Sequence, residues 1–146
     1  MAYSKIEGLT LKIAEDAAAV HGYGIYDVVY VKEGPHWFLR IYIDRAEGVS
    51  LDDCEAISKV IGDRLDADDF IKENYFLEVS SPGLERALRQ DWHFDGAVGE
   101  RVRARLKNGG EYAGVLSAHS GGSVTIDGNV LQKSGIAKAN IIFDFA

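Results

Sequence analysis

The chain has 146 residues, of which 47% are hydrophobic, so it can bury one good core or two small ones, and an intrinsically disordered protein is excluded. Its one cysteine, Cys54, excludes an intramolecular disulfide and a cluster of thiolate metal ligands within one chain. No basic-then-apolar opening predicts a secretory signal, and no apolar stretch approaches the roughly 20 residues of a membrane helix, so we expect a soluble cytoplasmic protein without a membrane partner.

The net charge of −7 is concentrated in the first part of the chain. Residues 1–90 contain 10 Lys and Arg against 17 Asp and Glu, whereas residues 91–146 contain 6 of each. An acidic surface repels phosphate backbones and attracts basic proteins. RNA binding by the whole surface is therefore not expected.

The chain opens with the pattern of an amphipathic helix. Ser4 and Glu7 have the spacing of a capping box, which predicts that the helix begins there. Apolar residues then recur at spacings of three and four and predict one buried stripe that ends near residues 21–22. The stripe consists of Ile6, Leu9, Ile13, Ala17 and Val20.

Two strands, a second helix and a third strand follow. Residues 25–32 and 37–44 are rich in β-forming residues, and the four residues between them predict a hairpin loop. Ser50 can cap a second helix, whose predicted buried stripe is Cys54, Ile57, Ile61 and Leu65. From Tyr75 onward apolar and polar residues alternate as in a half-buried strand. The predicted first domain, residues 1–89, is α-β-β-α-β, with two helices on a three-stranded sheet.

The third strand ends in a turn at Ser81, Pro82 and Gly83. Gly83 tolerates a positive φ there, and Pro82 favours an extended Ser81. We expect residues 84–88 to form one helical turn, with Leu84 packed as the apolar foot of the connection.

A second domain is predicted for residues 90–146. Residues 90–99 read as a linker, and short strands follow at 101–106, 111–118, 123–127 and 130–133, separated by glycine-rich turns. Residues 134–140 read as a turn before a last strand at 141–145. Several short strands within about 50 residues predict a small β-barrel, so the fold class is α+β.

The sequence contains no assembled catalytic, cofactor or metal site. The four histidines, His21, His36, His93 and His119, fall in separate elements, and we expect each at the surface or in a turn. Cys54 lies on an apolar stripe, which favours core packing over reactivity. The protein is therefore not expected to be an enzyme or to have a small-molecule substrate.

Two groups of arginines are candidates for phosphate contacts. Arg101, Arg103 and Arg105 alternate along a predicted strand and would share one face. Arg86 and Arg89 follow the turn at Pro82 and Gly83. An ordinary solvated strand face is the alternative interpretation of the first group.

The segment LEVSSPGLER, residues 77–86, resembles the signature of the RimP family of bacterial ribosome maturation factors. The resemblance continues through VVYVKEG, LRIYID, GVSLDDCE and IAKAN, and so spans nearly the whole chain. The chain departs from the family pattern at Glu85, where the family carries Asp, and at Ala87, where it carries Pro.

The resemblance implies that residues 90–146 form an SH3-like or Sm-like barrel. It also implies a factor, a monomer in our expectation, that binds the free 30S small ribosomal subunit and promotes its late assembly and 16S rRNA maturation. Its partners would be a basic ribosomal protein near the decoding region and the adjacent 16S rRNA. The candidate subunit-binding residues are Ser80, Ser81, Pro82, Gly83, Leu84, Glu85, Arg86, Arg89, Arg101, Arg103 and Arg105.

A second hypothesis is a stand-alone Sm-like regulator whose barrel oligomerises and binds single-stranded RNA. The electrically neutral barrel region and the acidic first domain argue against it. A third hypothesis, a small hydrolase, lacks an assembled site.

Overall fold

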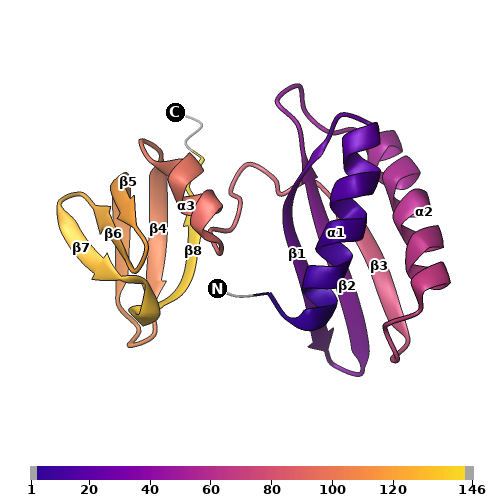
Figure 1. Ribbon diagram of the computed structural model, residues 1–146. Coiled ribbons are helices and arrows are strands. Elements are labelled where there is room, and N and C mark those ends of the chain that lie inside the picture. The colour runs from indigo at the N-terminus through magenta and orange to yellow at the C-terminus, as the bar shows by residue number, and fades with distance from the viewer. Residues whose placement is uncertain (1–2, 144–146) are drawn as a thin grey trace. The chain divides into compact units, whose positions relative to one another are not determined.

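The computed structural model describes residues 3–143, and the chain separates into two compact units, residues 2–82 and 83–146. The first unit contains two helices and three strands, and the second contains a five-stranded antiparallel sheet with one short helix (Figure 1). The predicted α+β class is confirmed. The domain limits at residues 89 and 90 stay a prediction, whereas the described contacts divide the chain between Pro82 and Gly83.

The first unit has the predicted order of helix, strand, strand, helix and strand. The sheet order is β1-β2-β3, in which β1 and β2 are antiparallel and β2 and β3 are parallel. The two helices lie side by side on one face of this sheet (Figure 1). The elements are α1 (Lys5–Val20), β1 (Gly24–Glu33), β2 (His36–Asp44), α2 (Leu51–Asp68) and β3 (Tyr75–Ser80).

Both long helices begin with a capping box. In α1 the Glu7 N–H donates to Ser4 Oγ over 3.2 Å, and the Ser4 N–H donates to the Glu7 carboxylate over 2.9 Å. In α2 the same exchange joins Ser50 and Asp53. These bonds satisfy backbone donors that have no partner within the helix, so they fix where each helix starts.

The core of the first unit lies between the helices and β2. The predicted stripe of α2 is confirmed, and it packs with Leu39, Ile41 and Ile43 of the sheet. The predicted stripe of α1 is partly wrong, because Val20 is 82% exposed and Leu9 is also exposed. Ala14 and Ala18 are buried in their place. The predicted four-residue hairpin loop is also wrong: Glu33 pairs with His36, which leaves a two-residue turn.

The second unit is built on the strand order β7-β6-β5-β4-β8. Its core is formed by Leu88, Phe94, Ala97, Val102, Ala104, Leu116, Val124, Ile126 and Ala139. Its elements are α3 (Asp91–Ala97), β4 (Arg101–Leu106), β5 (Glu111–Ser120), β6 (Ser123–Ile126), β7 (Asn129–Gln132), the 3-10 turn η1 (Lys133–Gly135) and β8 (Ile136–Ile141).

Three segments of this unit differ from their predictions. The expected linker at 90–99 contains α3, which begins after Gln90 and buries Phe94 and Ala97 against the sheet. The expected turn at 134–140 is mostly β8, because pairing with β4 makes these residues extended. Of the expected last strand at 141–145, residue 141 is the end of β8, residues 142–143 are not in a strand, and residues 144–145 lie outside the described chain.

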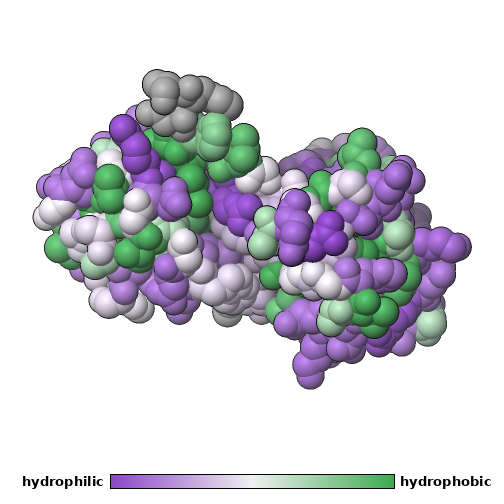
Figure 2. Space-filling view, turned by 90° about the horizontal axis from the view of Figure 1, so that it is seen from above, coloured by the Kyte–Doolittle hydropathy of each residue, from purple (hydrophilic) through white to green (hydrophobic). Residues whose placement is uncertain are grey.

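On the face shown in Figure 2, hydrophilic side chains cover most of the first unit, and hydrophobic side chains form smaller groups. Among the described helices, none has the length and apolar character needed to cross a membrane.

Candidate functional site

The turn after β3 has the backbone that its sequence predicts. Gly83 has a φ of 81°, a conformation that glycine adopts at low cost. Ser80, Ser81 and Pro82 belong to the first unit, and Gly83 begins the second. The expected packing of Leu84 is wrong, because its side chain is 61% exposed.

Leu84 and Glu85 form a turn and residues 86–88 pair with β8, so the helical turn expected at 84–88 is wrong. Ala87 pairs with Asn140 of β8, the Leu88 N–H donates to the Ala139 carbonyl over 2.8 Å, and the Ile141 N–H donates to the Arg86 carbonyl over 3.0 Å. The Glu85 carboxylate accepts a 3.3 Å hydrogen bond from the Phe143 N–H. The chain therefore adds a short paired segment to the edge of β8. This position leaves both Arg86 and Arg89 half-buried.

The outer face of β4 carries the three alternating arginines. Arg101, Arg103 and Arg105 are exposed, and the intervening Val102 and Ala104 are buried, so their predicted placement on one strand face is confirmed. The Arg103 guanidinium lies 2.9 Å from the Glu111 carboxylate of β5, which neutralises part of this charge.

Sequence reasoning missed a fourth cation on this face. Lys138 of β8 lies directly opposite Arg105 in the antiparallel register, and it is exposed. It was missed because residues 134–140 were assigned to a turn. The alternation of Lys138 and Asn140 with Ala139 and Ile141 was the available signal.

Two histidines are not at the surface, which corrects the prediction for His93 and His119. His93 is 3% exposed, and its Nδ1 accepts hydrogen bonds from the Arg89 and Gln90 N–H groups at 2.9 and 3.0 Å. It therefore caps the start of α3. His21 and His36 are exposed, as predicted.

The side chain of His119 is 4% exposed and lies in a polar network. Its Nδ1 is 2.6 Å from Asp95 Oδ1, and its Nε2 is 2.9 Å from Lys133 Nζ. Because an ammonium group can only donate, Nε2 is the acceptor, and Nδ1 carries the proton donated to Asp95. The network joins α3 to β5 and η1, so it holds the second unit together.

The Lys133 ammonium is also bound to the Asp91 carboxylate, over 2.6 Å. This hydrogen bond and the positive charge of Lys133 hold the pKa of Asp91 below its usual value. The same ammonium lies 4.8 Å from the centre of the Phe94 ring. These contacts fix the position of the Lys133 side chain.

Neither a reactive thiol nor a cluster of metal ligands is found among the described residues. Cys54 is buried in the core of the first unit, and burial raises the pKa of its thiol. Within residues 3–143, no three or more His, Cys, Asp or Glu side chains gather as metal ligands would.

The two units differ strongly in charge. Residues 2–82 carry eight Lys and Arg against sixteen Asp and Glu, whereas residues 83–146 carry eight against seven. In the second unit, the exposed face of β4 that carries Arg101, Arg103 and Arg105 (the arginine face) is therefore not opposed by a large negative charge. The negative charge of the first unit favours a basic partner.

Comparison with known families gives a match that covers the first part of the chain. The sequence model of the RimP N-terminal domain matches residues 13–85, which is half of the chain. The matched region runs from within α1, through β3, to the turn at Gly83 and Glu85.

Proposed function

The chain belongs to the RimP family, and we propose that it is a ribosome maturation factor that binds the free 30S small ribosomal subunit. It promotes late subunit assembly and 16S rRNA maturation without catalysing a reaction. It acts as a cytoplasmic monomer, and the sheet of its second unit is part of an SH3-like or Sm-like barrel. The match of the RimP N-terminal domain over residues 13–85 carries this proposal.

The first unit binds a basic ribosomal protein near the decoding region. Its excess of eight negative charges favours such a partner and disfavours direct contact with phosphates. Long-range attraction between opposite charges would also speed the encounter.

The second unit and the preceding turn contact the adjacent 16S rRNA. The β4 face supports this assignment, because three exposed guanidinium groups on one strand can approach successive phosphates. The proposed contact residues are Ser80, Ser81, Pro82, Gly83, Leu84, Glu85, Arg86, Arg89, Arg101, Arg103 and Arg105.

The mechanism is a shift in population. An immature subunit samples several conformations, and a factor that binds one of them more tightly increases its share. No bond is made or broken by the factor. Its effect is limited by the difference in affinity between the conformations.

Sedimentation of a cell lysate tests the proposed partner. The protein should co-sediment with free 30S subunits and be nearly absent from 70S ribosomes, because a maturation factor must leave before the subunits join. Immunodetection across a sucrose gradient measures this distribution. Equal occupancy of both pools contradicts the proposal.

Charge removal on β4 tests the RNA contact. Replacing Arg101, Arg103 and Arg105 with Ala should weaken 30S binding on the order of tenfold at low salt, with the loss shrinking as salt is raised. Pull-downs over a salt series measure the effect. This triple variant is a cleaner test than Arg86→Ala with Arg89→Ala, because the latter side chains are half-buried.

The matched control removes the same charge from the first unit. Lys5, Lys12 and Lys59 are exposed on α1 and α2, and their replacement with Ala should leave 30S binding unchanged within about twofold. Equal loss in both triple variants would show that only net charge matters and would remove the β4 face from the proposed site.

A further inference from the structure

Lys138 of β8 lies beside Arg105 of β4 on the outer face of the second sheet. The two residues are directly opposite each other in the antiparallel register of these strands, and both side chains are exposed. Residues that are directly opposite across two antiparallel strands have Cβ atoms about 5 Å apart. The guanidinium group of one and the ammonium group of the other can therefore reach the same anion.

A β-bulge at Ala137 places Lys138 on this face. The register of β4 and β8 shifts between Lys138 and Ile136, so Ala137 is an extra residue of β8. In a regular strand, residues 136 and 138 would point to the same face of the sheet, because side chains alternate. Instead, Ile136 packs against the core and Lys138 is exposed. The bulge therefore accounts for the position of Lys138 beside Arg105.

Arg105 and Lys138 carry like charges, and no carboxylate compensates them. Within residues 3–143, neither side chain takes part in an ion pair. Glu111 lies opposite Arg105 on β5, but its carboxylate is 2.9 Å from the Arg103 guanidinium instead. Like charges that are directly opposite each other destabilise a sheet. Unfavourable local arrangements of this kind are expected at functional sites.

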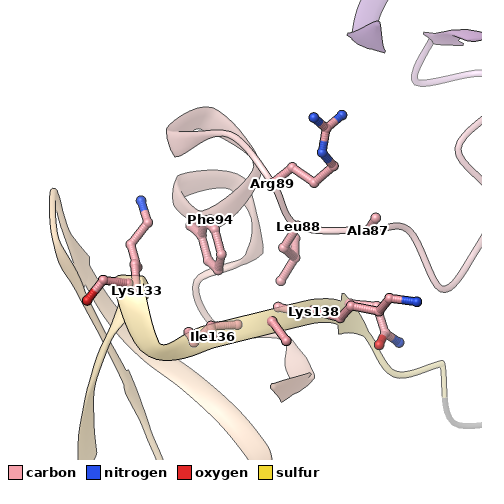
Figure 3. A pocket seen from close by; sticks show the side chains of 11 residues that line it. Ala87, Leu88, Arg89, Phe94, Lys133, Ile136 and Lys138 are labelled. Atoms are coloured by element: carbon pink, nitrogen blue, oxygen red, sulfur yellow. The ribbon is translucent and has the colours of Figure 1, made fainter. Parts of the chain in front are cut away.

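Lys138 is separate from the polar network around His119. Lys133, which precedes β8, is bound to Asp91 and to His119. Figure 3 shows Lys133 and Lys138 extending from the chain in different directions. The Lys138 ammonium can therefore bind a partner outside the protein, whereas the Lys133 ammonium is held by contacts within the second unit.

We propose that Arg105 and Lys138 together bind one phosphate group of an RNA backbone. Arg101 lies four residues from Arg105, which is about 13 Å along an extended strand, and contacts a second phosphate. Arg103 remains bound to Glu111 and contributes little. This assignment rests on the proposed RNA contact of the second unit, and it states which cations hold the phosphates.

A chain of phosphates fits this face better than a free phosphate ion. The pair of Arg105 and Lys138 and the separate Arg101 are exposed, so a polymer can contact both positions at once. An exposed pair of cations holds a single ion weakly, because water competes for the cations and salt screens them. When one phosphate of a chain is bound, binding of the next becomes effectively intramolecular.

NMR titration of the full chain with decauridylate at low salt tests the proposal. The dissociation constant should be on the order of 0.1 mM. The signals of Arg105 Nε–H and Lys138 Nζ should shift together, and the Arg103 Nε–H signal should shift least, because its guanidinium is bound to Glu111. Absence of shifts at Arg105 and Lys138 with millimolar RNA overturns the proposal.

Inorganic phosphate, at the same concentration of phosphate groups, is the control ligand. It should shift the Arg105 and Lys138 signals less than the oligonucleotide does, and equal shifts would contradict a site for RNA. The 30S subunit takes no part in either titration. Failure of this proposal is therefore distinguishable from failure of the sedimentation test of the proposed function.

Single and double variants test whether the two cations share a phosphate. Arg105→Ala and Lys138→Ala should each weaken RNA binding about fivefold. The double variant should lose less than about tenfold, because the shared phosphate contact can be lost only once. Fluorescence anisotropy of labelled decauridylate measures the affinities. A loss of about 25-fold in the double variant would mean independent contacts and would contradict the shared site.

Lys138→Glu separates RNA binding from stability. It places a carboxylate opposite Arg105, so RNA binding should fall at least about tenfold while the melting temperature rises by about 2 °C. Lys107→Glu makes the same charge change in the exposed turn after β4, and it should weaken binding about threefold at most. Equal weakening by the two substitutions, or a lower melting temperature for Lys138→Glu, overturns the proposal.

Discussion

The carboxylate of Glu7 joins the start of α1 to the sheet. One oxygen accepts a hydrogen bond from the Ser4 N–H, and the other accepts one from the Tyr30 N–H of β1, each at 2.9 Å. Because Glu7 is buried, water cannot easily replace its carboxylate as the acceptor of these two hydrogen bonds. A single side chain thus completes the helix cap and positions the helix on β1.

Replacing Glu7 with Ala should destabilise the first unit by about 2 kcal/mol, because two backbone donors lose their acceptor. Chemical denaturation followed by circular dichroism measures the change. Glu15→Ala, at an exposed position of the same helix, is the control and should cost less than about 0.5 kcal/mol. If Glu7→Ala and Glu15→Ala lower the free energy of unfolding equally, Glu7 contributes only its helix propensity.

The contacts and backbone conformation of single residues were predictable where the residues that determine them are near in sequence. Ser4 with Glu7 follows a three-residue spacing that local geometry fixes, and the positive φ of Gly83 follows from its turn. The bond from Tyr30 to Glu7 and the burial of His119 depend on residues more than 13 positions away. No local pattern contains that information.

At the scale of elements, β5 and the turn after β6 meet at Gly114. Asp127, in the turn, has a φ of 48°, and its carboxylate accepts a 3.0 Å hydrogen bond from the Val115 N–H. A Cβ atom at Gly114 would overlap this carboxylate. Glycine is therefore required at position 114 as long as Asp127 occupies the turn.

Gly114→Ala should destabilise the second unit by about 1 to 3 kcal/mol. In an Asp127→Gly background the same substitution should cost at least about 1 kcal/mol less, because the obstructing carboxylate is gone. A double-mutant cycle by denaturant unfolding measures the coupling. Gly122→Ala, where an added Cβ meets nothing within 4 Å, is the control for the loss of glycine. Additive costs at 114 and 127 would contradict the steric explanation.

Helices and strands were predictable where apolar residues recur at a regular spacing along the sequence. Both long helices and the strands of the first sheet carry clear repeats, and their order was confirmed. The pairing of Ala87 with Asn140 was missed, as were α3 and β8, because distant partners and not local propensity determine their conformation. The arginine face on β4 was predicted, but Lys138 could join it only once β8 was known to be a strand.

For the whole molecule, the distribution of charge between the two units determines the affinity for nucleic acid. The first unit has twice as many acidic as basic residues, and the arginine face belongs to the nearly neutral second unit. Of the three arginines on β4, Arg103 is already paired with Glu111. Few phosphates can therefore be neutralised, and the acidic unit repels the rest of any long strand.

Affinity for short random RNA should consequently be weak at physiological salt. Because each neutralised phosphate of a single strand contributes about 0.7 to the slope of log K against log salt, three arginines predict a slope no steeper than about −2. Fluorescence anisotropy of a labelled oligonucleotide over a salt series measures it. Tight, length-dependent binding with a slope steeper than about −4 would indicate a much wider phosphate contact. That result would favour an Sm-like RNA regulator over a factor whose RNA contact is confined to one face and depends on a protein partner bound beside it.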